Sequence, residues 1–356
     1  MKKIIFLISN LNLGGAEKTV YSLYKYYKRS NNVKIICFER NIRFSLNEDI
    51  ISLNQKPLDK EDTSFFLLFR IINILKKIYL VRKIFIIYRP DVIVSMTPSV
   101  NLYSIFCSLF LKNKIIISER ISKNFFNHSF IKKLVINFFY KYCDKLVVQT
   151  DEILQDYKDF NTTIIPNFVT KTKLRINYFK QRKNIISVGR LDNQKNFQFL
   201  IKAFANSLKA NKDWRLLIFG EGENLKSLRL MIKNYKLEKN IFLKGVSQNI
   251  KKELVNASFY ASTSLYEGFS NAMLEATSVG LPIIAFDGVS GNNKIVINGF
   301  NGIVVKSKKN INEYSQGLSN LMSQIDLQKK YSINSLKIAE KYSQEKIMKL
   351  WNNIIL

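Results

Sequence analysis

Two carboxylates stand on either side of a stretch of chain that could hold a ligand rich in hydroxyl and phosphate groups. Glu267 falls in a loop, and Glu275 falls on the second turn of a helix that Ser270 or Asn271 can cap and that the Gly-Leu-Pro at 280–282 ends. Carboxylates accept hydrogen bonds from sugar hydroxyls, and backbone N–H groups at a helix start donate to phosphate oxygens. The spacing of Glu267 and Glu275 alone fits an exposed loop followed by an exposed helix face equally well. Gly268 breaks the chain before the helix, and the backbone N–H groups between the two carboxylates belong to Phe269, Ser270 and Asn271.

Two cations follow another expected strand end, in the segment SVGRLDNQKN. The strand ends at Gly189, and the loop after it displays Arg190 and Lys195. Cations five residues apart at a strand–loop–helix junction can grip a diphosphate from two directions, whereas two solvated surface cations are the simpler alternative.

A glycine pair, Gly14 and Gly15, comes directly after the first apolar run of the chain. Glycine lets the backbone approach a ligand closely, and the following helix would present its N–H groups and positive dipole end to a phosphate. The segment is neither a GxGxxG nor a Walker A loop, so an ordinary strand–helix turn remains an alternative.

Short apolar runs alternate with helical patterns along the whole chain, which favours parallel sheets covered on both faces. The alternation restarts at Asn184, so we predict two doubly wound Rossmann-like domains with a ligand cleft at the carboxyl ends of their strands. We expect an N-terminal domain over 1–168, a second domain over 184–340, and a C-terminal helix over 341–356 that packs back on the first. The strands are expected at Lys3–Ser9, Val33–Phe38, Asp91–Met96, Lys114–Ser118, Lys145–Gln149, Thr163–Ile165, Asn184–Gly189, Trp214–Gly220, Ile241–Leu243, Ser258–Ser262, Pro282–Phe286 and Gly302–Val305.

The composition narrows the function classes. The 356 residues carry a net charge of +29, which implies an anionic partner such as nucleic acid, a phosphate-rich substrate or an anionic membrane, although AT-rich codon usage accounts for part of it. With a single histidine, His128, the chain cannot build a multi-His metal site or an HExxH protease, and a dedicated metal site is not expected. The three cysteines are expected to be reduced and buried. The first apolar run fits a buried strand better than a signal peptide, and no transmembrane helix is expected.

Four segments in this order, GGAEK, SVGRLDNQKN, LLIFGEGE and EGFSNAMLEATSVGLPIIA, closely resemble family-4 retaining glycosyltransferases of the GT-B fold. The resemblance implies that Glu267 and Glu275 bind the donor, with Glu275 at the ribose hydroxyls and Glu267 near the transferred sugar. It also implies that Arg190 and Lys195 contact the donor diphosphate. We therefore expect catalytic roles for Glu267, Arg190 and Lys195. The residues expected to bind the donor are Gly14, Gly15, Gly189, Arg190, Lys195, Gly220, Gly245, Val246, Glu267, Gly268, Phe269, Ser270, Asn271 and Glu275.

One departure concerns the acceptor side. Many relatives carry a His near the sugar, where this chain reads Ser118-Glu119-Arg120. The Ser-Glu-Arg segment resembles a branch of the family that builds bacterial exopolysaccharide, O-antigen and lipid-linked oligosaccharides, often from galactose-type donors. We therefore expect Ser118, Glu119 and Arg120 on the acceptor side.

Two basic stretches interleaved with aromatic and aliphatic residues suit an anionic membrane leaflet. They are Phe65–Arg89, in a region without acidic residues between Asp62 and Asp91, and Phe125–Lys145. The alternative is a pair of ordinary helices with one core face and one solvated lysine face.

The expected reaction moves a hexosyl or N-acetylhexosaminyl unit from a nucleotide diphosphate sugar, UDP-linked and of the galactose or GalNAc type, to a polyprenyl-diphosphate-linked glycan, with retention and without a metal or other cofactor. The expected location is the inner face of the cytoplasmic membrane. The alternatives are a basic nucleic-acid-binding protein, which no RNP, helix-turn-helix or zinc-finger pattern supports, and a dinucleotide-dependent oxidoreductase, which lacks its GxGxxG.

Overall fold

The computed structural model describes residues 1–12, 14–39, 48–55, 66–120, 122, 130–177, 183–208 and 211–356. The chain forms two compact units. Unit 1 consists of Met1–Ile165 with Leu350–Leu356, and unit 2 consists of Pro166–Lys349. The residues between the two expected domains therefore belong to unit 2. His128 and the first residues of both basic stretches, Phe65 and 125–129, lie outside the described residues.

Unit 1 contains, in its described residues, a seven-stranded sheet in the order β3-β2-β1-β4-β5-β6-β7. All neighbouring strands pair in parallel. The order reverses beside β1, whose two neighbours are β2 and β4, and this reversal is the switch point at which a doubly wound sheet opens a crevice. The strands are β1 Lys3–Ile8, β2 Asn32–Glu39, β3 Ile50–Gln55, β4 Val92–Met96, β5 Lys114–Ser118, β6 Lys145–Val148 and β7 Thr162–Ile164.

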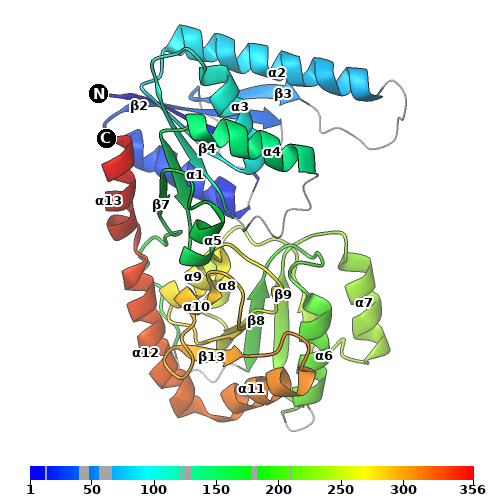
Figure 1. The fold of residues 1–356 in the computed structure, drawn as a ribbon. Coiled ribbons are helices and arrows are strands. Elements are labelled where there is room, and N and C mark those ends of the chain that lie inside the picture. The colour runs from blue at the N-terminus through cyan, green and yellow to red at the C-terminus, as the bar shows by residue number, and fades with distance from the viewer. Residues whose placement is uncertain are drawn as a thin grey trace. The chain divides into compact units, whose positions relative to one another are not determined.

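Helices cover both faces of this sheet because alternate residues of each buried strand are apolar on both sides. Ile5 and Leu7 of β1 pack with α2 and α3, while Phe6 contacts the ring of Tyr27 on α1 at 6.4 Å. The Tyr27 hydroxyl donates to Asn352 of the C-terminal helix at 2.8 Å. Helices α2, α3 and α4 lie on one side of the sheet in Figure 1. The helices are α1 Gly15–Tyr27, α2 Phe66–Tyr88, α3 Pro98–Ser108, α4 Phe130–Phe139, the 3₁₀ helix η2 Tyr140–Tyr142 and α5 Asp151–Asp156.

Unit 2 repeats the plan with a six-stranded parallel sheet in the order β10-β9-β8-β11-β12-β13, a count that refers to its described residues. Its switch point lies between β8 and β11, which pair in parallel with Phe259 opposite Ile185. The strands are β8 Asn184–Val188, β9 Arg215–Phe219, β10 Ile241–Leu243, β11 Phe259–Ala261, β12 Ile283–Phe286 and β13 Gly302–Val305.

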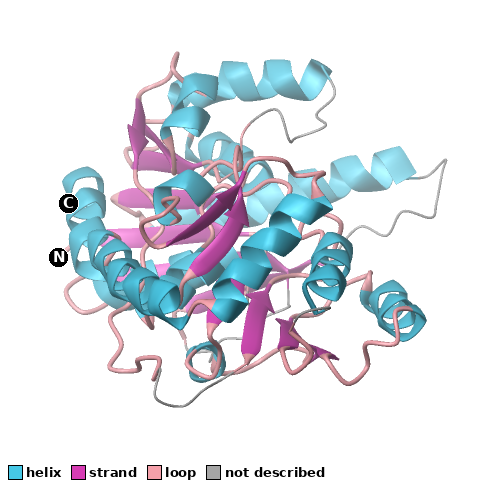
Figure 2. Ribbon diagram, turned by 90° about the horizontal axis from the view of Figure 1, so that it is seen from below, coloured by secondary structure: helices cyan, strands magenta, loops and turns pink. Residues whose placement is uncertain are grey.

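The unit 2 sheet is also covered on both faces. Ile185 of β8, Ile218 of β9 and Phe286 of β12 pack against α6, α7 and α11, while α9 packs against α12. Figure 2 shows the strands in magenta between helices in cyan. The helices are α6 Phe197–Ser207, α7 Leu225–Asn234, α8 Ile250–Leu254, α9 Asn271–Ser278, α10 Asn292–Ile295, α11 Ile311–Ser323, α12 Ile325–Lys341 and α13 Gln344–Ile355, whose residues from Leu350 onward count with unit 1.

The expected strands are present, most of them within one or two residues of their expected bounds. Strand β3 was not predicted, because its polar residues at 52, 54 and 55 break the apolar pattern of a buried strand. All three cysteines are free, and Cys37 and Cys107 are buried as expected, but Cys143 is partly exposed. Among the described residues, none of the helices combines the length and apolarity needed to cross a bilayer.

Candidate functional site: the carboxyl edge of the unit 2 sheet

The carboxyl ends of β8 and β11 lie side by side at the switch point of unit 2. The loop after β8 carries Gly189, Arg190 and Lys195, and the loop after β11 leads through Glu267 to α9. Open α/β sheets bind their ligands in this position, outside the carboxyl ends of the strands that flank the reversal. The sheet order therefore brings the predicted cation loop and the predicted glutamate loop to one edge.

An ion pair joins these two loops. The Lys195 ammonium contacts a carboxylate oxygen of Glu267, and the Ser264 hydroxyl donates to the same oxygen at 2.9 Å. Only 17% of the Lys195 side chain and 12% of the Glu267 side chain are exposed. The Thr263 hydroxyl donates to the Lys195 carbonyl at 2.9 Å, so the backbone as well as the side chain of Lys195 is fixed by the loop after β11.

Glycines follow three adjacent strands at this edge. Gly189 comes after β8, Gly220 after β9, and Gly245 lies two residues after β10. The Gly220 N–H donates to the Gly245 carbonyl at 2.8 Å, and a Cβ at Gly220 would lie 1.8 Å from the Gly189 carbonyl oxygen. A side chain at Gly189 would meet the aliphatic part of Lys195 at 2.8 Å. The Lys195 side chain extends over the bare backbone of Gly189, and Val246, next to Gly245, is 39% exposed.

The negative charges of Glu267 and Glu275 both affect the pKa of one buried phenol, that of Tyr260. Tyr260 of β11 is 2% exposed, and its hydroxyl donates to the Val188 carbonyl at 3.1 Å. Burial raises the pKa of Tyr260 well above that of a free phenol, and the negative charges of Glu267 and Glu275 raise it further. Glu267 and Glu275 therefore lie within electrostatic range of the same point between the ends of β8 and β11.

The start of α9 is held rigidly. The Ser270 side chain caps the helix by accepting from the Met273 N–H at 3.5 Å, as the sequence predicted. The Asn167 side chain donates to the Phe269 carbonyl at 2.8 Å from a buried position. Gly291 approaches so closely that a Cβ there would lie 2.2 Å from the Gly268 carbonyl oxygen. Asn271 begins the helix, so its first N–H groups open toward the loop that carries Glu267.

Arg190 is not part of this cluster. Its side chain is 77% exposed and forms an ion pair with Asp192 at 3.3 Å, while a guanidinium nitrogen lies 3.5 Å from the Gln194 side-chain oxygen. Asp192 also accepts from the Lys195 N–H at 3.1 Å. The expected two-sided grip by Arg190 and Lys195 would thus need Arg190 to leave Asp192, and the role of Arg190 stays a prediction.

The glycine pair of the first loop lies in unit 1, where Gly14 caps α1 with ordinary extended dihedral angles. A Cβ on Gly14 would lie 2.3 Å from a carboxylate oxygen of Glu17, so the missing side chain makes room for Glu17 over the helix start. That Gly14 and Gly15 contact the donor stays a prediction.

The three residues expected on the acceptor side differ in their exposure. Ser118 and Glu119 are both 0% exposed, so their side chains do not line a surface. Arg120 is partly exposed, and its guanidinium lies 2.7 Å from the sulfur of Met96 at the end of β4. That Ser118, Glu119 and Arg120 lie on the acceptor side stays a prediction.

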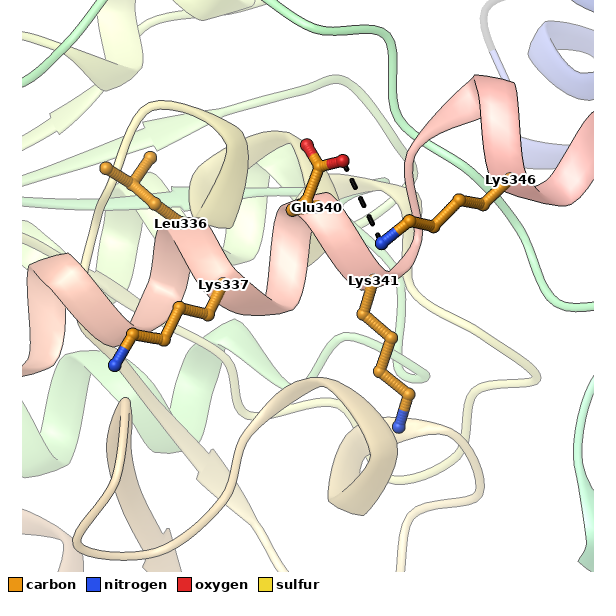
Figure 3. Close-up of a pocket in the computed structure, with 5 residues that line it drawn as sticks. All are labelled: Leu336, Lys337, Glu340, Lys341 and Lys346. Atoms are coloured by element: carbon orange, nitrogen blue, oxygen red, sulfur yellow. Dashed lines mark ion pairs between the residues drawn. The ribbon is translucent and has the colours of Figure 1, made fainter.

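A shallow pocket of about 460 Å³ lies elsewhere in unit 2, at the junction of α12 and α13, and Figure 3 shows the side chains that line it. Its Lys346 pairs with Glu340 at 3.8 Å, while Lys337 and Lys341 point away from that carboxylate. Its lining does not include any residue of the carboxyl edge.

Sequence reasoning missed Tyr260, Ser264 and Asn167, which fix the carboxyl edge of unit 2 from β11 and from the start of unit 2. A signal for Ser264 exists in the polar run that follows the apolar strand β11. Tyr260 and Asn167 give no such signal, because their partners are backbone carbonyls 72 and 102 residues away.

Comparisons with known proteins agree with this geometry. Residues 170–337 match the family described as glycosyl transferases group 1. The chain is 26% identical to N-acetylgalactosamine-N,N'-diacetylbacillosaminyl-diphospho-undecaprenol 4-alpha-N-acetylgalactosaminyltransferase of Campylobacter jejuni, over 98% of this chain and 97% of that one. It is 27% identical to the amylovoran biosynthesis glycosyltransferase AmsD of Erwinia amylovora, over the full length of both.

The fold is shared with a solved TarM mutant of S. aureus in complex with fondaparinux, alpha-GlcNAc-glycerol and UDP. That chain has a TM-score of 0.79 at 16% identity, with 99% of each chain covered. The predicted fold class, two doubly wound units of the GT-B type, is confirmed. This chain therefore contains, over residues 170–337, a domain of the glycosyl transferases group 1 family.

Proposed function

We propose that this protein transfers a hexosyl or N-acetylhexosaminyl unit from a UDP-linked sugar to a lipid-linked glycan in bacterial polysaccharide synthesis. One observation carries the donor part: Lys195 and Glu267 meet at the switch point of unit 2, beside three strand-end glycines and the start of α9. A cation, bare backbone and helix N–H groups suit a nucleoside diphosphate, and carboxylates suit sugar hydroxyls. The TarM structure contains UDP, which supports the choice of base.

The proposed reaction retains the anomeric configuration. The acceptor oxygen bonds to the anomeric carbon on the face from which the diphosphate leaves, and the acceptor proton passes to an oxygen of that departing phosphate. Lys195 stabilises the charge that develops on the diphosphate, and the start of α9 adds its dipole. In this scheme Glu267 and Glu275 hold the donor and do not act as acid, base or nucleophile.

The lipid-linked acceptor is proposed from relatives. The Campylobacter jejuni enzyme is named for a diphospho-undecaprenol substrate, and the Erwinia amylovora protein for amylovoran biosynthesis. Both relatives align with this chain over nearly their full length. Because such acceptors reside in a bilayer, we place the protein on the cytoplasmic face of the membrane.

The test is a UDP-release assay over a panel of UDP- and GDP-sugars with a polyprenyl-diphosphate-linked glycan as acceptor. The expected result is acceptor-dependent release of UDP from one galactose- or GalNAc-type donor and an α-linked product by NMR. The Glu275→Gln variant is the matched control and should lose most of this turnover. Release from a GDP-sugar alone would overturn the base assignment, and a β-linked product from an α-linked donor would overturn retention.

Helix α2 supports the membrane part of the proposal because it is apolar on two opposite faces. Val81 and Phe85 are buried against the sheet of unit 1. The opposite face carries a row of exposed apolar side chains, here called the outer stripe of α2. Its members are three, four and seven residues apart, and the exposed Lys76 and Lys83 lie between them in the sequence. The outer stripe consists of Ile72 (52% exposed), Leu75 (59%), Tyr79 (64%) and Ile86 (53%). An apolar stripe with lysines beside it fits an anionic leaflet.

A second stripe continues from α4 into η2. Leu134, Phe138 and Tyr142 follow each other at intervals of four residues and are 53%, 56% and 52% exposed. The exposed apolar outer faces favour a membrane surface over the alternative of two ordinary helices, each with one core face and one solvated lysine face.

Sedimentation with vesicles tests this part. The full chain should pellet with phosphatidylglycerol vesicles, pellet less in high salt, and stay in the supernatant with purely zwitterionic vesicles. The Leu75→Ser, Tyr79→Ser double variant should lose most of the binding. The matched control is Leu230→Ser, Ile333→Ser, which removes two equally exposed apolar residues (60% and 62%) from unit 2. Equal binding by both double variants would overturn the assignment to α2.

A further inference from the structure

The loop that carries Glu267 is held in place by side chains of neighbouring loops. Residues 262–270, here called the glutamate loop, run from the end of β11 to the start of α9 and contain no helix or strand. The cation loop, residues 189–196, lies between β8 and α6 and also lacks regular structure. Segments without a ladder of backbone bonds open most readily, so the bonds that reach them from outside decide how firmly they are held.

Gln194 of the cation loop bonds the glutamate loop twice. Its side-chain amide donates to the Tyr266 carbonyl at 2.9 Å, and its own backbone carbonyl accepts from the Leu265 N–H at 2.8 Å. The Tyr266 carbonyl belongs to the peptide bond that leads into Glu267, and Gln194 directly precedes Lys195. Gln194 is therefore the sequence neighbour of one partner of the ion pair and is bonded to the peptide of the other.

Lys308 bonds the same loop from the other side. Its ammonium donates to the Leu265 carbonyl at 3.1 Å and to the Gly288 carbonyl at 3.0 Å. Gly288 follows β12 and Lys308 follows β13, whereas Gln194 follows β8, and β11 lies between β8 and β12 in the sheet. Because hydrogen bonds from a charged donor are roughly twice as strong as neutral ones, Lys308 braces the glutamate loop firmly.

The bonded groups lie directly before Glu267 along the backbone. They are the Leu265 N–H, the Leu265 carbonyl and the Tyr266 carbonyl. A purely stabilising role would be served by bonds anywhere in unit 2, whereas these bonds converge on the peptides that set the direction of the Glu267 side chain. Direction matters at such a place, because a misplacement of about 1 Å costs on the order of 100-fold in rate.

Lys195 has supports of its own. Its carbonyl accepts from the Thr263 hydroxyl at 2.9 Å, and its N–H donates to Asp192 at 3.1 Å. Loss of the Gln194 amide would therefore loosen Glu267 and leave the proposed diphosphate cation in place. Glu267 is proposed to lie near the transferred sugar, so transfer is expected to suffer more than binding of the nucleotide.

We propose that Gln194 is a positioning residue for sugar transfer, which holds Glu267 beside Lys195 through its bond to the Tyr266 carbonyl. Lys308 braces the glutamate loop from the other side. This inference rests on the proposed function and deepens it. The donor touches Lys195 and Glu267, whereas Gln194 and Lys308 act through the loop and are not catalytic residues. Supporting bonds of this kind keep reacting groups within about 0.5 Å of their productive positions.

Steady-state transfer by the full chain tests the proposal through Gln194→Met, which keeps the length of the side chain and removes its amide. The expected result is a kcat lowered roughly 10-fold, with the donor KM and the Kd of UDP within about twofold of their original values. Gln328→Met is the matched control, because the Gln328 amide also donates to a backbone carbonyl of unit 2, that of Leu321. It should lower the thermal midpoint and leave kcat unchanged.

A double-mutant cycle separates positioning from a general structural role. In a Glu267→Ala background no carboxylate remains to be positioned, so Gln194→Met should lower kcat by less than about twofold more. Losses of kcat that multiply in full would show that Gln194 acts elsewhere and would overturn the proposal. A donor KM that rises while kcat stays unchanged would overturn it as well, because Gln194 would then serve binding rather than transfer.

Lys308→Met decides the question where Gln194→Met does not fold. It removes both bonds from the ammonium to the carbonyls, so kcat should fall roughly threefold, and less than about twofold in the Glu267→Ala background. Lys309→Met, one residue away at an exposed position, controls for the loss of one positive charge and should leave kcat unchanged. An unchanged kcat in the folded Gln194 and Lys308 variants overturns the inference alone. Absence of transfer by the unaltered protein would overturn the proposed function and this inference with it.

Discussion

Exchanging each of the two donor-site glutamates for glutamine separates their roles, because both changes remove one negative charge and keep the side-chain shape. In the structure, Glu267 forms an ion pair with Lys195, the cation that is proposed to hold the donor diphosphate. The family resemblance assigns Glu275 to the ribose hydroxyls. We predict that Glu267→Gln tightens the binding of UDP and that Glu275→Gln weakens it.

The magnitude for Glu267 follows from Coulomb's law. A phosphate oxygen that contacts Lys195 comes to within about 5 Å of the Glu267 carboxylate, given N–O contacts of roughly 2.8 Å on either side of the ammonium. Two unit charges at that separation repel by roughly 3 kcal/mol at an effective dielectric constant of about 20. Exposure of 17% and 12% of the two side chains lets solvent reduce this to about 1–2 kcal/mol, or roughly 5- to 30-fold in affinity.

The opposite sign is expected for Glu275. A ribose hydroxyl can still donate to the glutamine oxygen, so it loses only the difference between a charged and a neutral acceptor, about 1–1.5 kcal/mol, or roughly 5- to 10-fold in affinity. Isothermal titration of UDP into each variant measures both changes, and thermal unfolding controls for folding. Transfer should fall in both variants, since Glu267 lies near the transferred sugar in the proposed complex.

The two variants carry the same net charge, so a general electrostatic effect would move both affinities in the same direction. UDP affinity that rises equally in both variants would mean that only net charge matters. Weaker binding of UDP to Glu267→Gln would contradict the competition between Glu267 and the diphosphate for Lys195.

Three further predictions concern single features. Gly220→Ala should destabilise the protein by about 3 kcal/mol or more in urea unfolding, because φ is 142° and the new Cβ would lie 1.8 Å from a backbone oxygen. Gly299→Ala, at φ 72° with open space around it, should cost only about 1 kcal/mol, and equal losses would contradict the steric reason. Burial raises the pKa of the Cys37 thiol to about 12, above its value in the unfolded chain, so its stabilisation is complete below about pH 8.5 and is lost as the pH rises toward 12. Cys37→Ala should therefore reduce the fall in unfolding free energy between pH 9 and 11 by about 1.4 kcal/mol per pH unit, and an unchanged slope would refute this. Because Lys195 and the start of α9 are proposed to hold the leaving diphosphate, transfer should survive dialysis against EDTA; activity that returns only with Mg²⁺ or Mn²⁺ would contradict that assignment.

The α/β architecture could be predicted because buried parallel strands read as short apolar runs between helical patterns. The run at 241–243 is strand β10 with the expected bounds, and the helix capped at Ser270 runs from Asn271 to Ser278. Strand β3 escaped prediction because a strand with polar residues at three of six positions lacks that pattern. The glycines after β8 and β9 were readable as strand ends, but not the 1.8 Å approach that makes Gly220 irreplaceable.

The acceptor side shows where sequence reasoning stopped. Ser118-Glu119-Arg120 reads as a polar loop after a strand, and polar loops are normally exposed. In the structure Glu119 is buried, because Asn101 of α3 and Tyr140 of η2 supply its donors from 18 and 21 residues away. Which side chains surround a carboxylate depends on how helices pack on the sheet, and local sequence does not encode that packing.

The types of residue at the donor edge were determined by the sequence alone: a cation after one strand, a carboxylate after another, and a capped helix. Their meeting was decided by the tertiary structure. Lys195 and Glu267 are 72 residues apart and form an ion pair because β11 pairs with β8 at the switch point of a parallel sheet. In such a sheet all carboxyl ends lie at one edge, so strand order rather than sequence distance selects which loops face each other.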